Sequence, residues 1–234
     1  VSNADEQNPF MGFRAIRYCL RNPDVFLDQL RAILRASAHG PIRLMFPMIS
    51  GIGEVIRAKE FLNTAKKQLT ENGVIFDQDI KVGCMIETPS AVMIADMLAD
   101  EVDFFSVGTN DLVQYLLAVD RVNNQIAYLY EPHHPAVIRS LKAIFDAGKK
   151  KNIPVSVCGE IAGDPHFLPL LLGLGVGSIS ASSPLLPELK FFARRFSMEE
   201  AIKFSKKLSL MRRPYEIKEA MNIFHEERVS KIIA

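Results

Sequence analysis

The stretch VDFFSVGTNDLVQY, residues 102–115, joins two patterns that together indicate the fold. Its first half is an apolar run typical of a strand buried in a parallel sheet. Directly after it come Gly108, Thr109, Asn110 and Asp111, so polar groups stand where a strand ends and a helix begins. In α/β folds functional residues collect at that junction. The stretch therefore predicts both a parallel α/β fold and a candidate site.

Four other apolar runs repeat the first half of this pattern. Continuous runs rich in Val, Ile and Phe suit strands that are buried on both faces of a parallel sheet. With VDFFSV they predict five strands. The four runs are IRLMFPM (42–48), IKVGCMI (80–86), IPVSVC (153–158) and GSISA (177–181).

Helical patterns separate the predicted strands. Asn22-Pro23 is typical of a helix start, with Asn22 as the N-cap, and Gly40 follows the end of that helix. Ser197 and Glu200 form a capping box ahead of another helix. This alternation predicts βα units, in either an open α/β sheet or a (β/α) barrel. Apolar stripes at helical spacing lie in residues 26–34, 55–69 and 137–145.

The length of the chain bears on the choice between these two architectures. A closed barrel needs eight strands and typically about 250 residues, whereas this chain has 234 residues and five predicted strands. The segment before Ile42 has helix and loop patterns, so we expect the chain to begin partway round a (β/α)8 TIM barrel. Residues 1–4 look like a remnant of cloning, and residues 5–234 are expected to form one partial barrel domain.

Composition narrows the class of protein. The net charge is +1, with 24% charged and 48% hydrophobic residues, which gives no reason to expect nucleic acid or a membrane surface as a partner. No apolar run is long enough for a transmembrane helix and no signal peptide opens the chain. The three cysteines, Cys19, Cys84 and Cys158, are widely spaced, which indicates a reducing, cytoplasmic compartment.

Two carboxylates follow neighbouring predicted strands. Glu87 comes after the second strand and Asp111 after the third. Each can give an oxygen to Mg²⁺ and leave other octahedral positions for water and substrate. The alternative interpretation is that both residues only cap the following helices, which Thr88 or Asn110 could do as well.

A thiol and several arginines complete the candidate site. Cys158 precedes a glycine at the end of the fourth strand, where it is either a buried structural cysteine or a proton donor or nucleophile in the cleft. Arg14 follows Gly12-Phe13, and Arg121 ends the stretch LAVDR. Guanidinium groups suit carboxylate or phosphate recognition, although most single arginines on helices are solvated.

Several stretches together resemble Enzyme I of the bacterial phosphoenolpyruvate-dependent sugar phosphotransferase system. The resemblance extends in order from about residue 8 to 175 and is weaker in the tail, where GSISASSPLLPELK departs from the usual ending. The matching stretches are NPFMGFRAIR (8–17), QLRAILRASAHG (29–40), MFPM (45–48), ETPSA (87–91), VDFFSVGTNDLVQYLLAVDR (102–121) and CGEIAGD (158–164).

The resemblance implies a C-terminal phosphoenolpyruvate-binding domain of the phosphoenolpyruvate/pyruvate TIM-barrel type, which requires Mg²⁺ and forms a homodimer. At the matching positions it implies the following roles. Glu87 and Asp111 would be the metal ligands. Asn110, with the Asp111 backbone, would hold the substrate phosphate, and Arg14 and Arg121 would contact phosphoenolpyruvate. Cys158 would protonate the enolate carbon as pyruvate forms.

The sequence also departs from the family pattern at two points. The family's phosphate-binding arginines on earlier barrel strands, in stretches such as LLRTEF, have no counterpart here. The N-terminal domain that carries the phosphorylated histidine and binds the carrier protein HPr also has no counterpart. We therefore expect a C-terminal part that carries the metal, proton-donor and dimer portions of the site and does not turn over alone.

Three alternative functions compete with this interpretation. Phosphoenolpyruvate synthase and pyruvate, phosphate dikinase have similar barrels, but AVDR and CGEIAGD fit Enzyme I better. A Mg²⁺-dependent pyruvate aldolase also places Glu and Asp at strand ends, but it would not need a thiol donor at Cys158. The third alternative is a non-catalytic dimerisation module, which would have no need of the strand-end residues.

Overall fold

Five parallel strands form one sheet, in the order β1-β2-β3-β4-β5. The computed structural model describes residues 8–229, so the suggested cloning remnant at residues 1–4 lies outside the described residues. All five predicted strands are confirmed. The strands are β1 (Arg43–Phe46), β2 (Lys81–Ile86), β3 (Phe104–Gly108), β4 (Val155–Cys158) and β5 (Ser178–Ile179).

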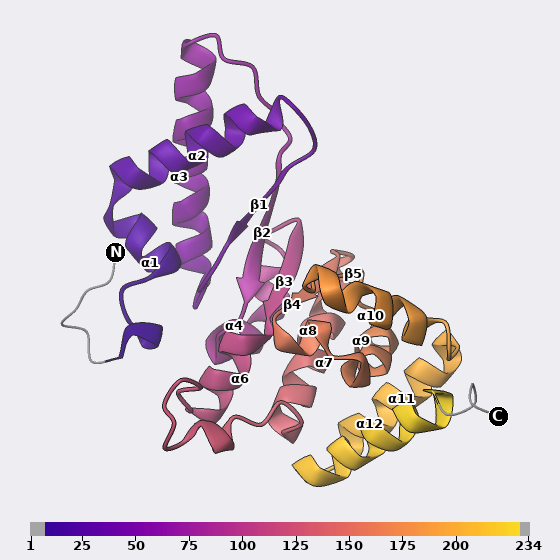
Figure 1. The fold of residues 1–234 in the computed structure, drawn as a ribbon. Helices are drawn as coiled ribbons and strands as arrows, with labels where there is room; N and C mark the ends of the chain where they lie inside the picture. Colours follow the sequence, from indigo (N-terminus) through magenta and orange to yellow (C-terminus); the bar gives the residue numbers. More distant parts are fainter. Residues whose placement is uncertain (1–7, 230–234) are drawn as a thin grey trace.

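Helices connect each strand to the next, as the alternating pattern predicts (Figure 1). The α-helices before β3 are α1 (Ala15–Arg21), α2 (Pro23–Ser37), α3 (Ile52–Glu71), α4 (Pro89–Met93) and α5 (Ala95–Leu98). Those after β3 are α6 (Thr109–Leu117), α7 (Pro135–Lys151), α8 (Glu160–Gly163), α9 (Leu168–Leu174), α10 (Leu186–Ala193), α11 (Met198–Leu210) and α12 (Pro214–Val229). Short 3₁₀ helices are η1 (Pro9–Met11), η2 (Ala127–Leu129), η3 (Pro165–Phe167) and η4 (Ser183–Leu185).

Helix ends agree with the sequence patterns except at one cap. The capping box of Ser197 and Glu200 is present at the start of α11. Asn22 occupies the N-cap position of α2, but its side chain makes no cap hydrogen bond. Its side-chain amide nitrogen donates instead to the Tyr18 carbonyl at 2.9 Å, in the last turn of α1.

The two faces of the sheet differ in burial. Alternate residues along a strand point to opposite faces, and the face that packs on the helices is buried from β1 to β4. The expectation of burial on both faces is confirmed for β3. It is wrong for β1 and β4, where buried and more exposed residues alternate, and for β5, where neither residue is buried. The register aligns Phe46, Cys84, Phe105 and Val155 on the helix-packed face, and Met85, Ser106 and Ser156 on the other.

Strand order and helix placement decide between the two predicted architectures. In doubly wound sheets the strand order reverses at a switch point and helices cover both faces. Here the order is sequential, and helices that follow successive strands contact one another, as in the pairs α5–α7, α7–α9 and α9–α11. This arrangement is that of a (β/α)8 barrel, of which the described residues form five strands.

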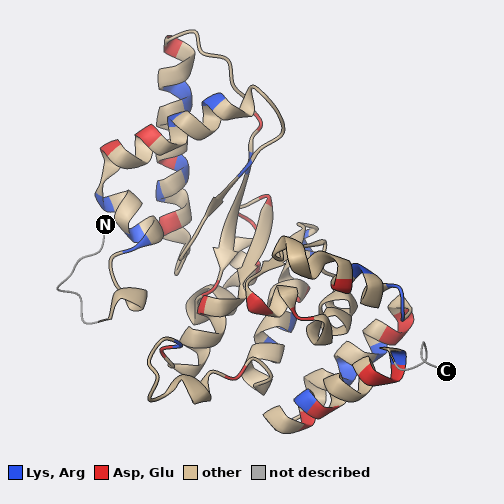
Figure 2. Cartoon of the chain, viewed as in Figure 1, with Lys and Arg blue, Asp and Glu red and all other residues tan. Residues whose placement is uncertain are grey.

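Charged residues lie mainly on the helices. Figure 2 shows both signs of charge along α3 and α12, whereas the strands are almost free of Lys, Arg, Asp and Glu. Within residues 8–229 no helix combines the length and the apolar character that a membrane-spanning segment needs. The sheet therefore contributes the apolar core, and polar groups at its edge stand out as candidates for function.

Candidate functional site

Three strand ends bring their polar residues to one edge of the sheet. Glu87 directly follows β2, Asp111 lies in the first turn of α6 after β3, and Cys158 ends β4. The parallel register pairs Ile86 with Val107 and continues across the next strand pair, so these ends are level. The sequence prediction that these side chains converge is supported by this placement.

Glu87 and Asp111 do not cap the helices that follow them. Thr88 caps α4, because its hydroxyl oxygen accepts a hydrogen bond from the Ala91 amide at 3.2 Å. Gly108 occupies the N-cap position of α6, where no side chain makes a cap hydrogen bond. Both carboxylates are nevertheless buried, with 4% and 6% of their surface exposed. Helix capping therefore does not explain why two charged groups are buried here.

Asp111 lies between two arginines. Arg14 Nη2 donates to Asp111 Oδ2 at 2.9 Å, and Arg121 Nη2 lies 3.6 Å from Asp111 Oδ1. Among the described residues only three buried side-chain atoms lack a hydrogen-bond partner, and two of them, Asp111 Oδ1 and Arg121 Nη1, are in this group. Buried polar atoms are nearly always paired, so these two mark a place where a ligand would bind.

Glu87 is held in place by the backbone at Met48 and Gly108. Its Oε1 accepts a hydrogen bond from the Met48 amide at 2.6 Å, and a Cβ at Gly108 would stand 2.4 Å from Oε2. Burial raises the pKa of Glu87 to about 7; the Met48 hydrogen bond opposes this rise, the charge of Asp111 adds to it, and Arg14 opposes it. The carboxyl thus lacks a neighbouring charge sufficient to keep it ionised.

The two carboxylates fit the requirements of a divalent cation. Asp111 Oδ1 accepts no hydrogen bond, and Glu87 is a buried carboxyl whose pKa is raised mainly by that burial. Hard carboxylate oxygens are the ligands that Mg²⁺ takes, usually one or two from protein with the rest from water and phosphate. No group of three or more His, Cys, Asp or Glu suited to a metal occurs within residues 8–229. A site here would therefore need ligands from outside the protein as well.

Asn110 is fixed by the strand end next to it. Its Oδ1 accepts a hydrogen bond from the Glu160 amide at 2.8 Å, which leaves the Nδ2 donors for another partner. The close approach requires glycine at position 159, where φ is 90° and a Cβ would stand 2.4 Å from Thr109 Oγ1. The amide expected to contact a phosphate thus presents donors, the polarity that an anion needs.

Cys158 lies on the sheet face opposite the helices, in register with Gly108. Its Sγ donates a weak hydrogen bond to the Val107 carbonyl at 3.4 Å, and Ser106 Oγ lies 3.9 Å from the sulfur. Burial raises the pKa of Cys158; Ser106 lowers it, and the charges of Glu87 and Asp111 raise it further. The group is therefore a protonated thiol at neutral pH, suited to give a proton rather than to attack.

Tyr115 and Gln114 join this site, although the sequence analysis did not single them out. Tyr115 follows Asp111 by one helical turn, a spacing that places both on one face of α6 and could have identified it. Gln114 is buried, and its Oε1 accepts a hydrogen bond from the Arg121 amide at 3.1 Å. This contact fixes the turn that carries Arg121.

Phe10 and Tyr130 also reach the site, and no sequence pattern identifies them. The guanidinium carbons of Arg14 and Arg121 lie 5.9 and 5.5 Å from the centre of the Phe10 ring. Tyr130 Oη lies 3.4 Å from the Asn110 carbonyl oxygen. Burial raises the pKa of Tyr130 to about 12, so its hydroxyl remains a hydrogen-bond donor.

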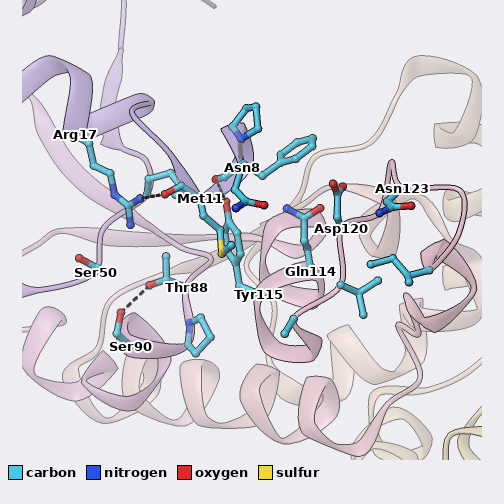
Figure 3. A pocket seen from close by; sticks show the side chains of 17 residues that line it. Asn8, Met11, Arg17, Ser50, Thr88, Ser90, Gln114, Tyr115, Asp120 and Asn123 are labelled. Carbon is cyan, nitrogen blue, oxygen red and sulfur yellow. Dashed lines mark hydrogen bonds between the residues drawn. The ribbon is translucent and has the colours of Figure 1, made fainter. Parts of the chain in front are cut away.

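A cavity of about 510 Å³ lies beside these residues. Figure 3 shows Arg17 and Thr88 on one side of it, Gln114 and Asp120 on the other, and Tyr115 between them. The strand-end carboxylates and the thiol do not belong to its described lining. The cavity is therefore adjacent to the polar cluster, and Tyr115 is a wall that contacts both.

Fold and site together define a (β/α)-barrel domain with carboxylates, arginines and a thiol at the carboxyl ends of its strands. Comparison with known families agrees with this class. Residues 1–198 match the family described as PEP-utilising enzyme, PEP-binding domain, and the chain belongs to that family.

Curated relatives include three named phosphoenolpyruvate-protein phosphotransferase. The Bacillus subtilis protein is 44% identical over 91% of this chain and 37% of its own length. The Priestia megaterium protein is 48% identical over 82% of this chain and 34% of its own length. The Geobacillus stearothermophilus protein is 46% identical over 84% of this chain and 34% of its own length. The chain thus spans about a third of these relatives.

Among solved structures, a citrate lyase from Burkholderia xenovorans LB400 has a similar fold. The TM-score is 0.54 with 17% sequence identity, over 88% of this chain and 69% of that chain. The likeness concerns the fold alone. It agrees with the barrel architecture that the strand order indicates.

Proposed function

We propose that this chain binds phosphoenolpyruvate with Mg²⁺ and belongs to a phosphoenolpyruvate-protein phosphotransferase of the Enzyme I type. The observation that carries the proposal is the buried Asp111 between Arg14 and Arg121, with one carboxylate oxygen and one guanidinium nitrogen that make no hydrogen bond. A carboxylate oxygen for a cation and a guanidinium donor for an anion thus lie together, as an anion that binds with a cation requires. Family membership and the names of the relatives support the substrate.

Each side chain has a role in this proposal. Arg14 and Arg121 bind the anionic groups of phosphoenolpyruvate, and the Asn110 amide donates to the phosphate together with the Asp111 backbone. Glu87 and Asp111 would hold Mg²⁺. When bound, the ion would offset charge on the phosphoryl group. The unpaired Asp111 Oδ1 and the raised pKa of Glu87 support this ligand pair.

Cys158 completes the chemistry as the proton donor. When the phosphoryl group leaves for a histidine, the P–O bond to the enol oxygen breaks and a P–N bond forms. The electron pair stays with the enolate, whose C3 carbon then takes the proton of the Cys158 thiol, giving pyruvate and a thiolate. The raised pKa of Cys158 supports this role, because the proton is held until a base such as the enolate carbon is formed.

The partners of the whole protein extend the proposal. In the parent enzyme the phosphoryl group would pass from the histidine domain to a phosphocarrier protein of the HPr type, in sugar transport, and the protein would be a cytoplasmic homodimer. The free cysteines support a reducing compartment. Analytical ultracentrifugation of the chain tests the dimer.

The proposed ligand is tested by isothermal titration of the chain with phosphoenolpyruvate in the presence of Mg²⁺. Asp111→Asn should abolish the heat of binding, because it removes a charge that the cation needs. Asp79→Asn, at an exposed turn position outside the site, is the matched control and should bind like the unsubstituted chain. Weak binding is expected, since the arginines of earlier barrel strands have no counterpart in this sequence.

The titration separates the proposal from a dimerisation module, and other observations separate it from the enzyme alternatives. A chain that only mediates dimerisation would show no heat with phosphoenolpyruvate, with or without Mg²⁺. An aldolase of the pyruvate-binding group would cleave a hydroxy-keto acid in a retro-aldol assay and would not depend on Cys158. A dikinase or synthase would share the phosphoenolpyruvate site, and the names of the relatives at 44–48% identity favour the phosphotransferase over it.

A further inference from the structure

The Phe10 ring contacts both arginines of the site. It belongs to η1, a short segment that precedes Arg14 in the chain. The guanidinium carbon of Arg14 lies 5.9 Å from the ring centre and that of Arg121 lies 5.5 Å from it. Both distances lie within the range of cation–π attraction. One aromatic ring thus holds two like charges that also share the carboxylate of Asp111.

The backbone of Phe10 is fastened to α6 by Tyr115. The Tyr115 hydroxyl donates to the Phe10 carbonyl oxygen, and Arg14 Nη1 lies 3.4 Å from the same oxygen. Arg14 Nη1 also donates to Tyr115 Oη at 3.3 Å. Because Tyr115 and Asp111 stand one turn apart on α6, the helix fixes the ring and the carboxylate together. Phe10, Tyr115, Arg14 and Asp111 thus form one connected network of contacts.

The choice of an aromatic partner has a chemical consequence. A ring face attracts a guanidinium group without accepting its N–H donors, whereas a carboxylate in the same place would occupy them. Arg121 Nη1 is buried and has no hydrogen-bond partner. The ring therefore orients Arg121 and leaves a donor available for an incoming anion.

We propose that Phe10 is a positioning residue that sets the spacing of Arg14 and Arg121 for a phosphate- and carboxylate-bearing ligand, with Tyr115 as its anchor. The inference rests on the proposed phosphoenolpyruvate site and adds residues that contact the arginines rather than the metal or the reacting atoms. An anion that displaces Asp111 from the arginines meets two guanidinium groups still held by the ring. Without the ring, two like charges separate, and the ligand must order both side chains on binding.

The first measurement concerns the arginines in the free protein. The guanidinium Nε–H signals of Arg14 and Arg121 are observed by ¹H–¹⁵N NMR in the full chain and in Phe10→Leu, Phe10→Tyr and Tyr115→Phe. Both arginine signals should carry a ring-current shift that is lost in Phe10→Leu and kept in Phe10→Tyr. Tyr115→Phe should change the Arg14 signal. Tyr128→Phe, a matched change at an exposed tyrosine, should change neither.

The second measurement is the affinity for phosphoenolpyruvate with Mg²⁺ by isothermal titration. Phe10→Leu should weaken binding roughly tenfold, since two cation–π contacts are lost, and Phe10→Tyr should restore it. The inference is overturned if the arginine signals of Phe10→Leu match those of the unsubstituted chain. It is also overturned if Phe10→Leu binds phosphoenolpyruvate as tightly as the unsubstituted chain does. Absence of binding by the unsubstituted chain would instead contradict the proposed function, and the arginine signals would still decide whether the ring positions the pair.

Discussion

Thr109 Oγ1 donates a hydrogen bond to the Cys158 carbonyl oxygen at 2.7 Å. Thr109 begins α6 and is fully buried, whereas Cys158 ends β4. This contact joins the helix that carries Asn110 and Asp111 to the strand that carries the thiol. This buried hydroxyl, together with the hydrogen bond from the Glu160 amide to Asn110 Oδ1, therefore helps to fix the relative placement of anion-binding and proton-donating groups.

Removal of that hydroxyl should destabilise the fold. Thr109→Val has nearly the same volume but cannot donate, so the free energy of unfolding should fall by about 1–2 kcal/mol. Thr109→Ser keeps the donor and should lose less. Urea denaturation followed by circular dichroism gives both values. A Thr109→Val chain as stable as the unsubstituted one would show that the hydrogen bond does not hold the two elements together.

A methyl group at Gly159 should disturb the same junction. Its φ of 90° disfavours any side chain, and a Cβ would stand 2.4 Å from Thr109 Oγ1 and 2.7 Å from Asn110 Oδ1. Gly159→Ala should therefore cost about 3 kcal/mol or more of unfolding free energy, from backbone strain and overpacking together. The control is Gly175→Ala, since Gly175 has a φ of 97° and a ψ of 35°, in the left-handed region, and nothing within 4 Å of a Cβ, whereas the ψ of −169° at Gly159 adds backbone strain to the steric clash. The control should cost only about 1 kcal/mol, and equal costs for the two variants would contradict the steric argument.

The sequence predicts the strands of this fold well, because apolar runs of Val, Ile and Phe have few alternatives to burial in a sheet. The last run, GSISA, gives a strand of only two residues, Ser178–Ile179. Convergence of Glu87, Asp111 and Cys158 follows from topology, since the ends of parallel strands meet at one edge. The sequence pattern alone therefore predicts the strands and the edge of the sheet on which the candidate site lies.

Contacts across long sequence separations could not be predicted in this way. Arg14 contacts Asp111, which is 97 residues away in the chain. Hydrophobic periodicity does not predict the path of the loop that carries Arg14. The ring of Phe10 and the amide of Met48 contribute by position rather than by a motif. The family resemblance, not the spacing of residues, indicated that Arg14 and Arg121 act together.

The raised pKa of Glu87 should make the metal-free chain less stable at high pH. Its pKa of about 7 exceeds the unfolded value of 4.5, so the folded state keeps a proton that the unfolded state loses. The stability contributed by this group is complete below pH 4.5 and is lost as the pH rises through 7. At pH 8 Glu87→Gln should therefore be more stable than the unsubstituted chain by roughly 3 kcal/mol, and at pH 4 the two should be alike. Urea titrations at both pH values with EDTA present measure this difference, and a constant difference would contradict it.

A histidine contact should make the attachment of α12 sensitive to acid. The His225 ring on α12 lies 4.3 Å from the His166 ring on η3 and 4.5 Å from Phe192 on α10, centre to centre. Burial lowers the pKa of His225 and the charge of His166 lowers it further, against the opposing effects of Glu188, Asp164 and Glu226.

Because the folded pKa of His225 is below its unfolded value of 6.5, the unfolded state binds the proton first as the pH falls. Stability from this group is thus present above pH 6.5 and is lost on acidification. His225→Phe keeps an aromatic ring and cannot titrate, so its stability relative to the unsubstituted chain should rise from pH 7.5 to pH 5.5. Urea denaturation at the two pH values measures the difference in unfolding free energy between His225→Phe and the unsubstituted chain. An equal difference at both pH values would contradict the prediction.

Cys158 should control proton exchange at the methyl group of pyruvate. The proposed protonation of the enolate carbon runs backwards when pyruvate and Mg²⁺ are supplied in D₂O, and ¹H NMR follows the loss of the methyl signal. Cys158→Ser should slow this exchange by about 10²-fold, the usual contribution of a general acid or base. Cys19→Ser, at a half-buried cysteine on α1, is the matched control and should exchange at the unsubstituted rate.

The pH dependence of that exchange distinguishes a thiol from other bases. In the reverse direction the thiolate must take the methyl proton, and burial raises the pKa of Cys158 above its ordinary value of 9.0. The thiolate fraction, and with it the exchange rate, should therefore increase steadily from pH 7 to pH 9. A carboxylate base with an ordinary pKa would be fully ionised over this range and would give a flat profile, and Glu87, with a pKa of about 7, would give a profile that levels off above pH 8. A flat profile that survives Cys158→Ser would assign the proton transfer to another group.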